Sequence, residues 1–273
     1  MGAAPNLGGA RSPVTDHQLL AEAIAEAALR PNLNFVSEKT QDQLDLQALH
    51  RVRSRLVSKR TATINQIRAF LLEQGITVRA GAHSLDNSLH AILQNREDEI
   101  SPRMRDIITG LYEDWIWLDG RIDTTTAEIE SISQGEENCR RLMSIPGIGP
   151  IISTSMVAAV GTGEAFDRGR DFAAWLGLIP RQYSTGGKTI LGRISKRGST
   201  YLRMLFVQAA NVIMMRPQNW PKFSFGSWLE GASQRMHRNK VAVALANKLA
   251  RIAWSVLRNK QSFDSHGIEV EAV

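Results

Sequence analysis

Ser-Ile-Pro-Gly-Ile-Gly-Pro at residues 144–150 and Ile-Ser-Lys-Arg-Gly-Ser-Thr-Tyr-Leu-Arg at residues 194–203 bound the most informative stretch of the chain. The first is a glycine turn between two short apolar segments, which predicts two helices joined by a tight connection. The second leads into an apolar segment that Ser199 can cap as a helix. Between them, the glycines of residues 181–197 predict an irregular or hairpin-like loop. The stretch therefore predicts a helical C-terminal domain with one glycine-rich loop.

Positive charge is concentrated in this same stretch. No Asp or Glu occurs between Asp171 and Glu230. The whole chain has a formal net charge of +6 and a sequence pI near 9.8, so the argument rests on clustering more than on the total. A surface of one sign favours a polyanion, because each phosphate that it neutralises releases condensed counterions. Nucleic acid is therefore the leading partner on physical grounds.

The Pro-Gly-Ile-Gly-Pro turn at residues 146–150 suggests a helix-hairpin-helix contact. Gly147 and Gly149 allow a sharp turn with positive φ, and Pro150 fits the first position of the following helix. Backbone amides at such a turn can bind one phosphate at the positive end of a helix. A plain connection between two helices uses the same residues, so both interpretations remain open.

The loop at residues 181–188 combines hydroxyls with cations and small residues. Ser184 or Thr185 could attack phosphorus, because neighbouring Arg and Lys side chains lower a hydroxyl pKa and neutralise charge in the transition state. Ser-Thr-Gly-Gly is also ordinary turn chemistry, which composition alone favours. The candidates for contact with nucleic acid are Gly147, Gly149, Arg181, Gly186, Gly187, Lys188, Arg193, Lys196, Arg197 and Arg203.

Two long helices are expected before this domain. Residues 41–74 repeat apolar side chains at three- and four-residue steps, and the basic opposite side is explained by solvation as well as by binding. Ser101 and Pro102 start a second helix, whose heptad seam would reach roughly 50 Å. The seam consists of Met104, Ile108, Leu111, Trp115, Leu118, Ile122, Thr125, Ile129 and Ile132. This arm forms either an antiparallel pair with the preceding helix or a dimer contact.

The remaining segments have weaker patterns. The polar segment around Gly81 is expected to be looser, residues 34–36 suggest a strand fragment, and residues 220–228 suggest an aromatic linker. A short alanine-rich helix is expected at residues 21–29 and a last helix at residues 239–257.

Several classes of protein are excluded by composition. Cys139 is the only cysteine, which rules out an internal disulfide and fits a reducing cytoplasm. The longest nearly apolar run, residues 151–160, is too short to span a bilayer, so no membrane partner is expected. The first 13 residues lack the apolar core of a signal peptide and are expected to be disordered. Neither the histidines nor the carboxylates show ligand spacing, so no metal is assigned. We expect a cytoplasmic protein.

The order of these motifs resembles the bacterial insertion-sequence transposases of the DEDD type, a family of bridge-RNA-guided recombinases. The resemblance covers about residues 21–257, which is most of the chain. The matching segments are Ala-Glu-Ala-Ile-Ala-Glu-Ala at 21–27, Leu-Gln-Ala-Leu-His-Arg-Val-Arg at 46–53, Ile-Pro-Gly-Ile-Gly-Pro at 145–150, Phe-Ala-Ala-Trp-Leu-Gly-Leu at 172–178, Pro-Arg-Gln-Tyr-Ser-Thr-Gly-Gly-Lys at 180–188, Ile-Ser-Lys-Arg-Gly at 194–198 and Val-Ala-Leu-Ala-Asn-Lys-Leu-Ala-Arg-Ile-Ala-Trp at 243–254.

The resemblance implies a mainly α protein in which parts of a larger enzyme are combined. Residues 1–14 would be disordered and unrelated, residues 15–80 a remnant of a RuvC-like α/β domain with the following basic helix, residues 81–138 a coiled-coil arm, and residues 139–273 a helical C-terminal transposase domain. Ser184 matches the serine that attacks DNA in the family, with Thr185 as the alternative if the alignment shifts by one. Such enzymes join donor and target DNA while a guide RNA selects both.

The sequence departs from the family at the magnesium ligands. The family's first Asp and its Glu would precede residue 1, and the places of its final Asp-x-x-Asp hold His17 and Leu20, with Asp16 one position off. The resemblance thus predicts a truncated copy without a cofactor, in which residues 1–80 are poorly anchored. One hypothesis is a transposase that cuts and exchanges DNA strands through Ser184 but is inactive alone. The other is a non-catalytic remnant that binds nucleic acid or forms homo-oligomers through the arm. A purely structural helical protein is disfavoured by the acid-free run.

Overall fold

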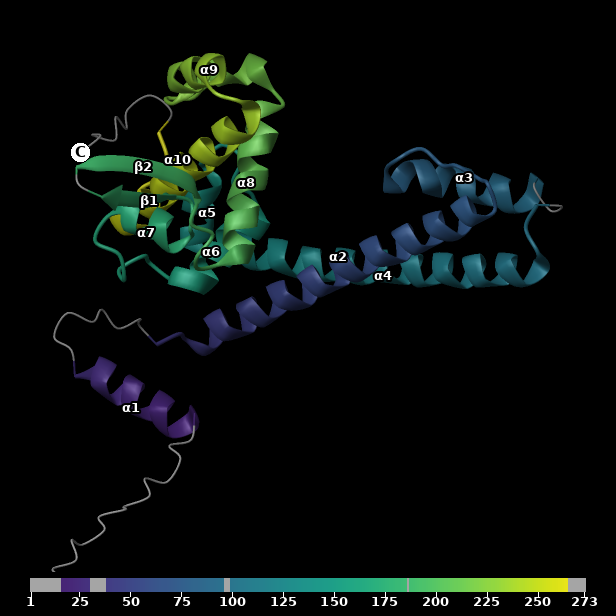
Figure 1. Cartoon of the computed structure of the whole chain (residues 1–273), viewed down its shortest axis with the longest axis horizontal. Helices are drawn as coiled ribbons and strands as arrows, with labels where there is room; N and C mark the ends of the chain where they lie inside the picture. Colours follow the sequence, from purple (N-terminus) through teal and green to yellow (C-terminus); the bar gives the residue numbers. More distant parts are fainter. Residues whose placement is uncertain (1–15, 30–37, 96–98, 186, 265–273) are drawn as a thin grey trace, which may run out of the picture. The chain divides into compact units, whose positions relative to one another are not determined.

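The computed structural model describes residues 16–29, 38–95, 99–185 and 187–264, and these are mainly helical. Figure 1 shows the helices and the single two-stranded hairpin, β1–β2, of the described residues. The mainly α fold class is therefore confirmed. The chain forms two compact units, Met1–Glu38 and Lys39–Val273.

Helix α1, Asp16–Ala28, is the described helix of the first unit. It confirms the short alanine-rich helix, although it begins earlier than expected. Its Leu19, Leu20 and Ile24 side chains are exposed. The disorder expected for residues 1–14 and the strand fragment expected at residues 34–36 fall outside the described residues.

The second unit begins with an arm formed by α2, Gln41–Glu73, α3, Ala82–Asn95, and α4, Pro102–Gly135. Thr40 and Gln43 form a reciprocal capping box that starts α2. Ser101 caps α4 and Pro102 stands in its first turn, as predicted. The two long helices lie side by side in Figure 1 and run antiparallel, which is one of the two arrangements that the heptad seam allowed.

The seam of α4 is buried against α2 over most of its length. Six of the expected positions are buried, namely Ile108, Trp115, Leu118, Ile122, Thr125 and Ile129. Thr125 satisfies its hydroxyl within the helix by donating to the Arg121 carbonyl at 2.8 Å. At the end of the seam Ile132 is 38% exposed and Ser133 is fully buried instead. The heptad prediction is thus correct up to its last step, where the buried side of the helix shifts from position 132 to position 133 because the helical period is longer than 3.5 residues.

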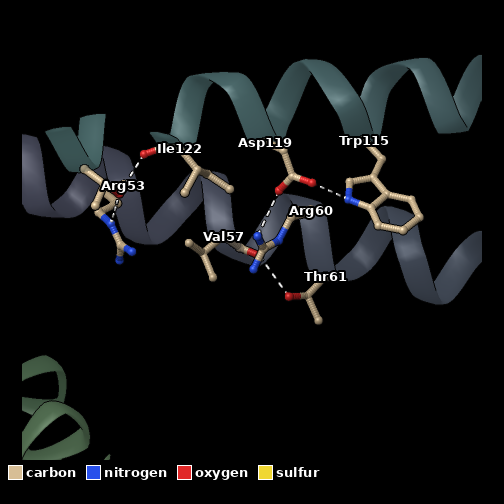
Figure 2. Close-up of polar contacts among 8 residues, drawn as sticks. Arg53, Val57, Arg60, Thr61, Trp115, Asp119 and Ile122 are labelled. Atoms are coloured by element: carbon tan, nitrogen blue, oxygen red, sulfur yellow. Dashed lines mark hydrogen bonds and ion pairs between the residues drawn. The ribbon is translucent and has the colours of Figure 1, made fainter. Parts of the chain in front are cut away.

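Polar contacts also join the two helices, as Figure 2 shows. Arg53 Nε donates to Thr126 Oγ1 at 2.8 Å. Arg60 Nη1 lies 2.9 Å from one oxygen of Asp119, and the other oxygen accepts from Trp115 Nε1 at 2.7 Å. As α2 proceeds from Arg53 to Arg60, its partner on α4 goes back from Thr126 to Asp119. The basic side of α2 is therefore only partly a solvated face, because these two arginines hold the arm together.

Helix α3 corrects the expectation of a looser segment around Gly81. Leu85 and Leu89, four residues apart, are fully buried among apolar side chains of α2 and α4 that include Ile67, Leu71 and Ile108. Tyr112 donates to Asp86 at 2.9 Å and connects α3 to α4. The sequence pattern does not reveal this helix, because few large apolar residues face inward amid polar neighbours.

The C-terminal part is built from α5, Glu137–Met143, α6, Pro150–Val160, α7, Gly169–Trp175, α8, Thr200–Met214, and α10, Arg238–Asn259. Helix α8 begins directly after Ser199, as expected, and α10 matches the helix expected at residues 239–257 to within two residues at each end. Their apolar side chains form one core, in which Phe172, Phe206 and Leu249 are fully buried. The hairpin strands are β1, Pro180–Thr185, and β2, Lys188–Ile194. The domain boundaries expected from the family resemblance stay predictions.

The expected aromatic linker at residues 220–228 is wrong. A 3-10 helix, η1, Pro217–Lys222, and a short helix, α9, Gly226–Arg235, occupy this region. Gly226 permits the close approach between them, because a Cβ there would lie 2.0 Å from the Trp220 carbonyl oxygen. Tertiary packing of Phe225 and Leu229 into the core, and not local propensity, makes α9 helical.

Helix α2 is also anchored to the C-terminal part. Gln43 Nε2 donates to the Val157 carbonyl at 3.1 Å, and Gln47 Nε2 donates to the Ala158 carbonyl at 2.7 Å. The Ala158 carbonyl lies in the last turn of α6, where carbonyls lack a partner within the helix, and the Val157 carbonyl also accepts from Gly161 N at 2.8 Å. The expectation that residues 1–80 are poorly anchored is therefore wrong for α2. None of the helices in the described ranges combines the length and apolar character that crossing a bilayer requires.

Candidate nucleic-acid interface

The hairpin that carries the candidate serine is a regular antiparallel pair. Ser184 lies opposite Thr189, and Thr185 lies opposite Lys188, with a bulge between Pro180 and Gln182. Gly187 has a φ of +81°, which the tight turn between the strands requires. The hairpin-like alternative for this loop is confirmed. Gly186 and the side chain of Thr185 fall outside the described residues.

Ser184 is exposed on β1. Its Oγ accepts a hydrogen bond from Gln182 Nε2 at 2.7 Å, and this bond does not use the proton of the Ser184 hydroxyl. Because side chains alternate across a strand, Ser184, Gln182 and Thr189 share one face of the hairpin. No titratable side chain bonds to Ser184 among the hydrogen bonds of the described residues. Activation of the hydroxyl would therefore have to come from the substrate complex.

The cations of the hairpin and its base form no ion pairs to carboxylates in the described structure. Arg181, Lys188, Arg193, Lys196 and Arg197 are all exposed. Arg181 makes one long contact to the Ser195 carbonyl, at 3.4 Å. The hairpin also exposes large apolar side chains, namely Tyr183, Ile190 and Leu191. A two-stranded ribbon exposed on both faces and edged by cations is suited to contact a polyanionic partner.

The base of the hairpin is fixed by a backbone-to-backbone contact with the end of α7, beside which it lies in Figure 1. Lys196 N donates to the Gly177 carbonyl at 3.1 Å, and Ser195 N donates to the Ile179 carbonyl at 2.8 Å. Both glycines at this contact have positive φ, +72° at Gly177 and +80° at Gly198. A Cβ on Gly198 would lie 1.7 Å from the Trp175 carbonyl oxygen. The Ser-Lys-Arg-Gly segment thus holds the hairpin in one position.

Arg203 supports this base from α8. Its Nη1 donates to the Leu176 carbonyl at 2.9 Å and to the Arg197 carbonyl at 3.2 Å, while Nη2 donates to Thr200 Oγ1 at 3.1 Å. The guanidinium is therefore occupied by the fold, which gives Arg203 a positioning role. Its expected contact with nucleic acid stays a prediction.

The glycine turn at residues 146–150 lies away from the hairpin. Gly147 has a φ of +81°, and a Cβ there would lie 3.0 Å from Ile213 Cδ1 and 3.2 Å from the Ala209 carbonyl oxygen. Gly149 caps α6 with extended backbone, and Pro150 starts the helix as expected. The turn packs on the last turns of α8, whereas the hairpin base contacts the first turn. Since 15 helical residues span about 22 Å, the two candidate phosphate sites are not adjacent. The plain helix connection explains Gly147, and its role in phosphate binding stays a prediction.

A buried histidine, which sequence reasoning set aside, joins three helices near the hairpin base. His50 Nε2 lies 3.0 Å from Thr154 Oγ1, and Nδ1 lies 3.3 Å from the Tyr201 hydroxyl. Thr154 donates its own proton to the Pro150 carbonyl at 2.6 Å, so it must accept from Nε2–H, and Tyr201 then donates to Nδ1. Burial lowers the pKa of His50 to about 4, and the nearby Arg53 adds to the shift. The sequence could have indicated that His50 is buried, because it lies four residues after Leu46 on the apolar side of α2.

Neutral His50 makes the free energy of unfolding depend on pH. The unfolded chain binds a proton near pH 6.5, whereas the folded chain resists protonation until about pH 4. Stability from this residue is complete above about pH 6.5 and decreases as the pH falls towards 4, by up to about 3 kcal/mol. Urea unfolding between pH 4 and 7 measures the loss, and the His50→Gln variant should show a shallower dependence. Equal pH dependence in both proteins would contradict a buried neutral histidine.

Metal-ligating side chains do not gather in the described ranges: no three His, Cys, Asp or Glu residues are placed so that they could hold a metal ion. The assignment of no metal to this chain stays a prediction.

Comparison with known proteins identifies relatives of both parts of the chain. Residues 139–224 match the transposase IS116/IS110/IS902 family, and residues 18–75 match a second family described as transposase. A probable family 20 transposase of Pseudomonas aeruginosa is 41% identical over 89% of this chain and 72% of its own length. The transposase for insertion sequence element IS1111A of Coxiella burnetii is 39% identical over 89% of this chain and 66% of its own. The transposase for element IS1328 of Yersinia enterocolitica is 43% identical over 86% of this chain and 70% of its own.

Proposed function

Because this chain belongs to the IS116/IS110/IS902 family of insertion-sequence transposases, we propose that it binds donor and target DNA and exchanges their strands through Ser184. The observation that supports this most directly is the hairpin itself. The Ser184 hydroxyl is exposed, and the same two strands carry the exposed cations Arg181, Lys188 and Arg193. The glycine-dependent base of the hairpin keeps that hydroxyl in a fixed position relative to the helical core.

The proposed chemistry consists of two balanced ester exchanges. Ser184 Oγ forms a bond to phosphorus, the bond from phosphorus to one sugar oxygen breaks, and the serine proton passes by way of solvent to the released sugar hydroxyl. A hydroxyl of the second DNA strand then attacks the same phosphorus and releases the serine with its proton restored. The hairpin cations would neutralise charge that develops on the phosphate oxygens.

Magnesium, which the family resemblance implies, does not fit the residues present. The aligned places at residues 17 and 20 hold His and Leu, and no three potential ligands gather in the described ranges. We therefore derive no step through a metal and propose that this chain alone binds DNA without cutting it. Covalent chemistry at Ser184 would then depend on a second polypeptide that supplies carboxylates. The guide RNA implied by the resemblance remains part of this proposal.

DNA binding by the hairpin base is tested by removing two of its charges. Lys196→Gln with Arg197→Gln should weaken binding of duplex DNA by ten-fold or more and reduce the slope of log K against log salt by about 1.8, because each lost phosphate contact removes about 0.9. Fluorescence anisotropy across a salt series measures both quantities. A matched control is Lys260→Gln with Arg258→Gln, because Lys196 and Lys260 both have positive φ, 56° and 52°, and both pairs are exposed. Equal losses in the two variants would contradict a specific role of the hairpin.

A second candidate function is a non-catalytic partner that self-associates through the arm. Trp117 on α4 is 59% exposed and Ile116 is 50% exposed, on the side of α4 that α2 leaves uncovered. The Arg121 guanidinium lies 5.5 Å from the centre of the Trp117 ring. Glu113 and Arg121 stand four residues before and after the tryptophan. An antiparallel two-fold pairing centred on Trp117 would place Glu113 opposite the partner subunit's Arg121, and Arg121 opposite the partner subunit's Glu113.

Charge reversal distinguishes this pairing from non-specific association. Glu113→Arg alone or Arg121→Glu alone should shift the protein towards monomer, because like charges then face each other across the two-fold axis. The double variant should restore the wild-type oligomer. Sedimentation velocity over a concentration series measures the distribution. A double variant that is as monomeric as either single variant would rule out this geometry.

A further inference from the structure

A cleft of about 670 Å³ lies between α2, α6, the end of α7 and the start of α8, and the hairpin chemistry does not use it. Its walls include Arg51 and Arg55 from α2, Trp175 from the end of α7, and Gly198 and Ser199 from the hairpin base. Volumes of this size, within about 300–1,000 Å³, are typical of sites that hold a small organic ligand.

The charged side chains that line the cleft are all positive. Lys39, Arg51 and Arg55 line it, whereas no Asp or Glu of the described residues does. All three cations are exposed, so their charged ends remain available in the described structure. Hydroxyls of Ser54, Ser58 and Ser155 supply hydrogen-bonding groups between them. Cations with adjacent hydroxyls are suited to the oxygens of a phosphodiester.

An aromatic platform stands in the same cleft. Trp175 is 37% exposed, and its ring stacks on Phe172 at a centroid distance of 5.9 Å and an interplanar angle of 20°. Phe172 is fully buried and also contacts Phe166 and Phe206, which fixes the position of the tryptophan. A fixed and partly exposed indole beside arginines is the combination with which proteins hold single-stranded nucleic acids.

We propose that this cleft binds an unpaired nucleotide of a nucleic-acid strand, with the base stacked on Trp175 and the phosphate held by Arg51 and Arg55. The inference rests on the proposed function, since the strand would continue over the hairpin base, whose Gly198 and Ser199 form one wall. Stacking against a tryptophan accepts any base, so the cleft distinguishes unpaired from paired strands and has little sequence preference. A paired base cannot reach the indole, because its faces are covered by its neighbours in the duplex.

The test compares the affinities of the protein for single-stranded and double-stranded nucleic acids of the same sequence. The full chain is titrated with a fluorescein-labelled single-stranded DNA of mixed sequence, with the RNA of the same sequence and with the corresponding DNA duplex. Arg51→Gln with Arg55→Gln should weaken single-strand binding by ten-fold or more and reduce its salt slope by about 1.4, at about 0.7 per phosphate. Duplex affinity should change by less than about two-fold. Trp175→Leu should weaken single-strand binding by about five-fold to a hundred-fold without altering the salt slope.

The outcomes separate this inference from the proposed function. The matched reference is Lys196→Gln with Arg197→Gln, which should weaken duplex binding. In one outcome, the cleft variants bind single strands like the wild-type protein while the reference variant loses duplex binding. This result would contradict the proposed nucleotide site in the cleft and would support the hairpin interface. A wild-type chain that binds no nucleic acid overturns both. If Trp175→Leu lowers the melting temperature strongly, the test of the cleft rests on the Arg51→Gln with Arg55→Gln variant alone, because both arginines lie on the exposed side of α2. Equal affinity for DNA and RNA supports recognition of phosphate and base, and tighter RNA binding assigns RNA as the source of the strand.

Discussion

Replacing Ser184 by alanine is expected to abolish covalent attachment of this chain to DNA while leaving its DNA affinity within about two-fold of wild type. The physical reason is that the hydroxyl is the only group removed, and its one described partner is the Gln182 side chain on the same strand. The expected loss of adduct is three orders of magnitude or more, since alanine has no hydroxyl that could attack phosphorus.

The measurement is a denaturing gel of protein–DNA adducts formed in the presence of the full-length Pseudomonas aeruginosa relative. This relative belongs to the same transposase family and tests whether a second polypeptide supports the reaction, and the two proteins are distinguished by mass. Thr185→Ala is the matched control, because it removes the neighbouring hydroxyl from the same strand. An adduct that persists in Ser184→Ala and disappears in Thr185→Ala would move the nucleophile by one residue. Binding without any adduct of the wild-type chain would favour the non-catalytic function.

Gly198→Ala is expected to detach the hairpin from the core and to lower the free energy of unfolding by about 3 kcal/mol or more. The added Cβ would lie 1.7 Å from the Trp175 carbonyl oxygen; the backbone of residue 198 fixes the Cβ, and the oxygen is itself a backbone atom. Neither can move without breaking the hydrogen bond from Lys196 N to the Gly177 carbonyl and the contacts of Arg203. Duplex binding should weaken along with stability, because the hairpin cations lose their fixed positions.

Gly187→Ala separates backbone strain from steric contact. Gly187 has a φ of +81°, almost the same as that of Gly198, but nothing lies within 4 Å of its added Cβ. This variant should lose only about 1–2 kcal/mol, which is the cost of a left-handed conformation. Urea unfolding monitored by tryptophan fluorescence measures both variants, since Trp175 adjoins the contact. Losses of similar size would show that strain and not the close backbone approach determines the role of Gly198.

Much of the helical architecture could be predicted from local patterns. Caps identified the starts of α4 and α8, where Ser101 and Ser199 accept from the backbone amides of Met104 and Leu202. The heptad spacing identified the buried side of α4. Helices α3 and α9 escape such prediction because each owes its conformation to burial of a few side chains against distant elements. Local propensity carries little of that information.

The candidate site was predictable in its residues and not in its arrangement. The acid-free run and the family motifs identified Ser184 and the nearby cations in the sequence as candidates. The glycine turn at 146–150 packs on the last turns of α8, whereas the hairpin base contacts its first turn, and no local pattern shows this separation. The His50 network and the nucleotide-sized cleft join α2 to α6 and α8, more than one hundred residues away in the chain.

Local patterns in the chain establish which segments are helical, where the positive charge is concentrated and to which family the protein is similar, because periodicity, caps and motif order can be read within single segments. The three-dimensional arrangement was needed to learn that α4 pairs with α2, that Arg203 holds the hairpin base, and that Arg51, Arg55 and Trp175 face one cleft. These facts depend on which surfaces meet after burial of apolar side chains. Such meetings are set by the packing of the whole core and are not encoded in any single segment.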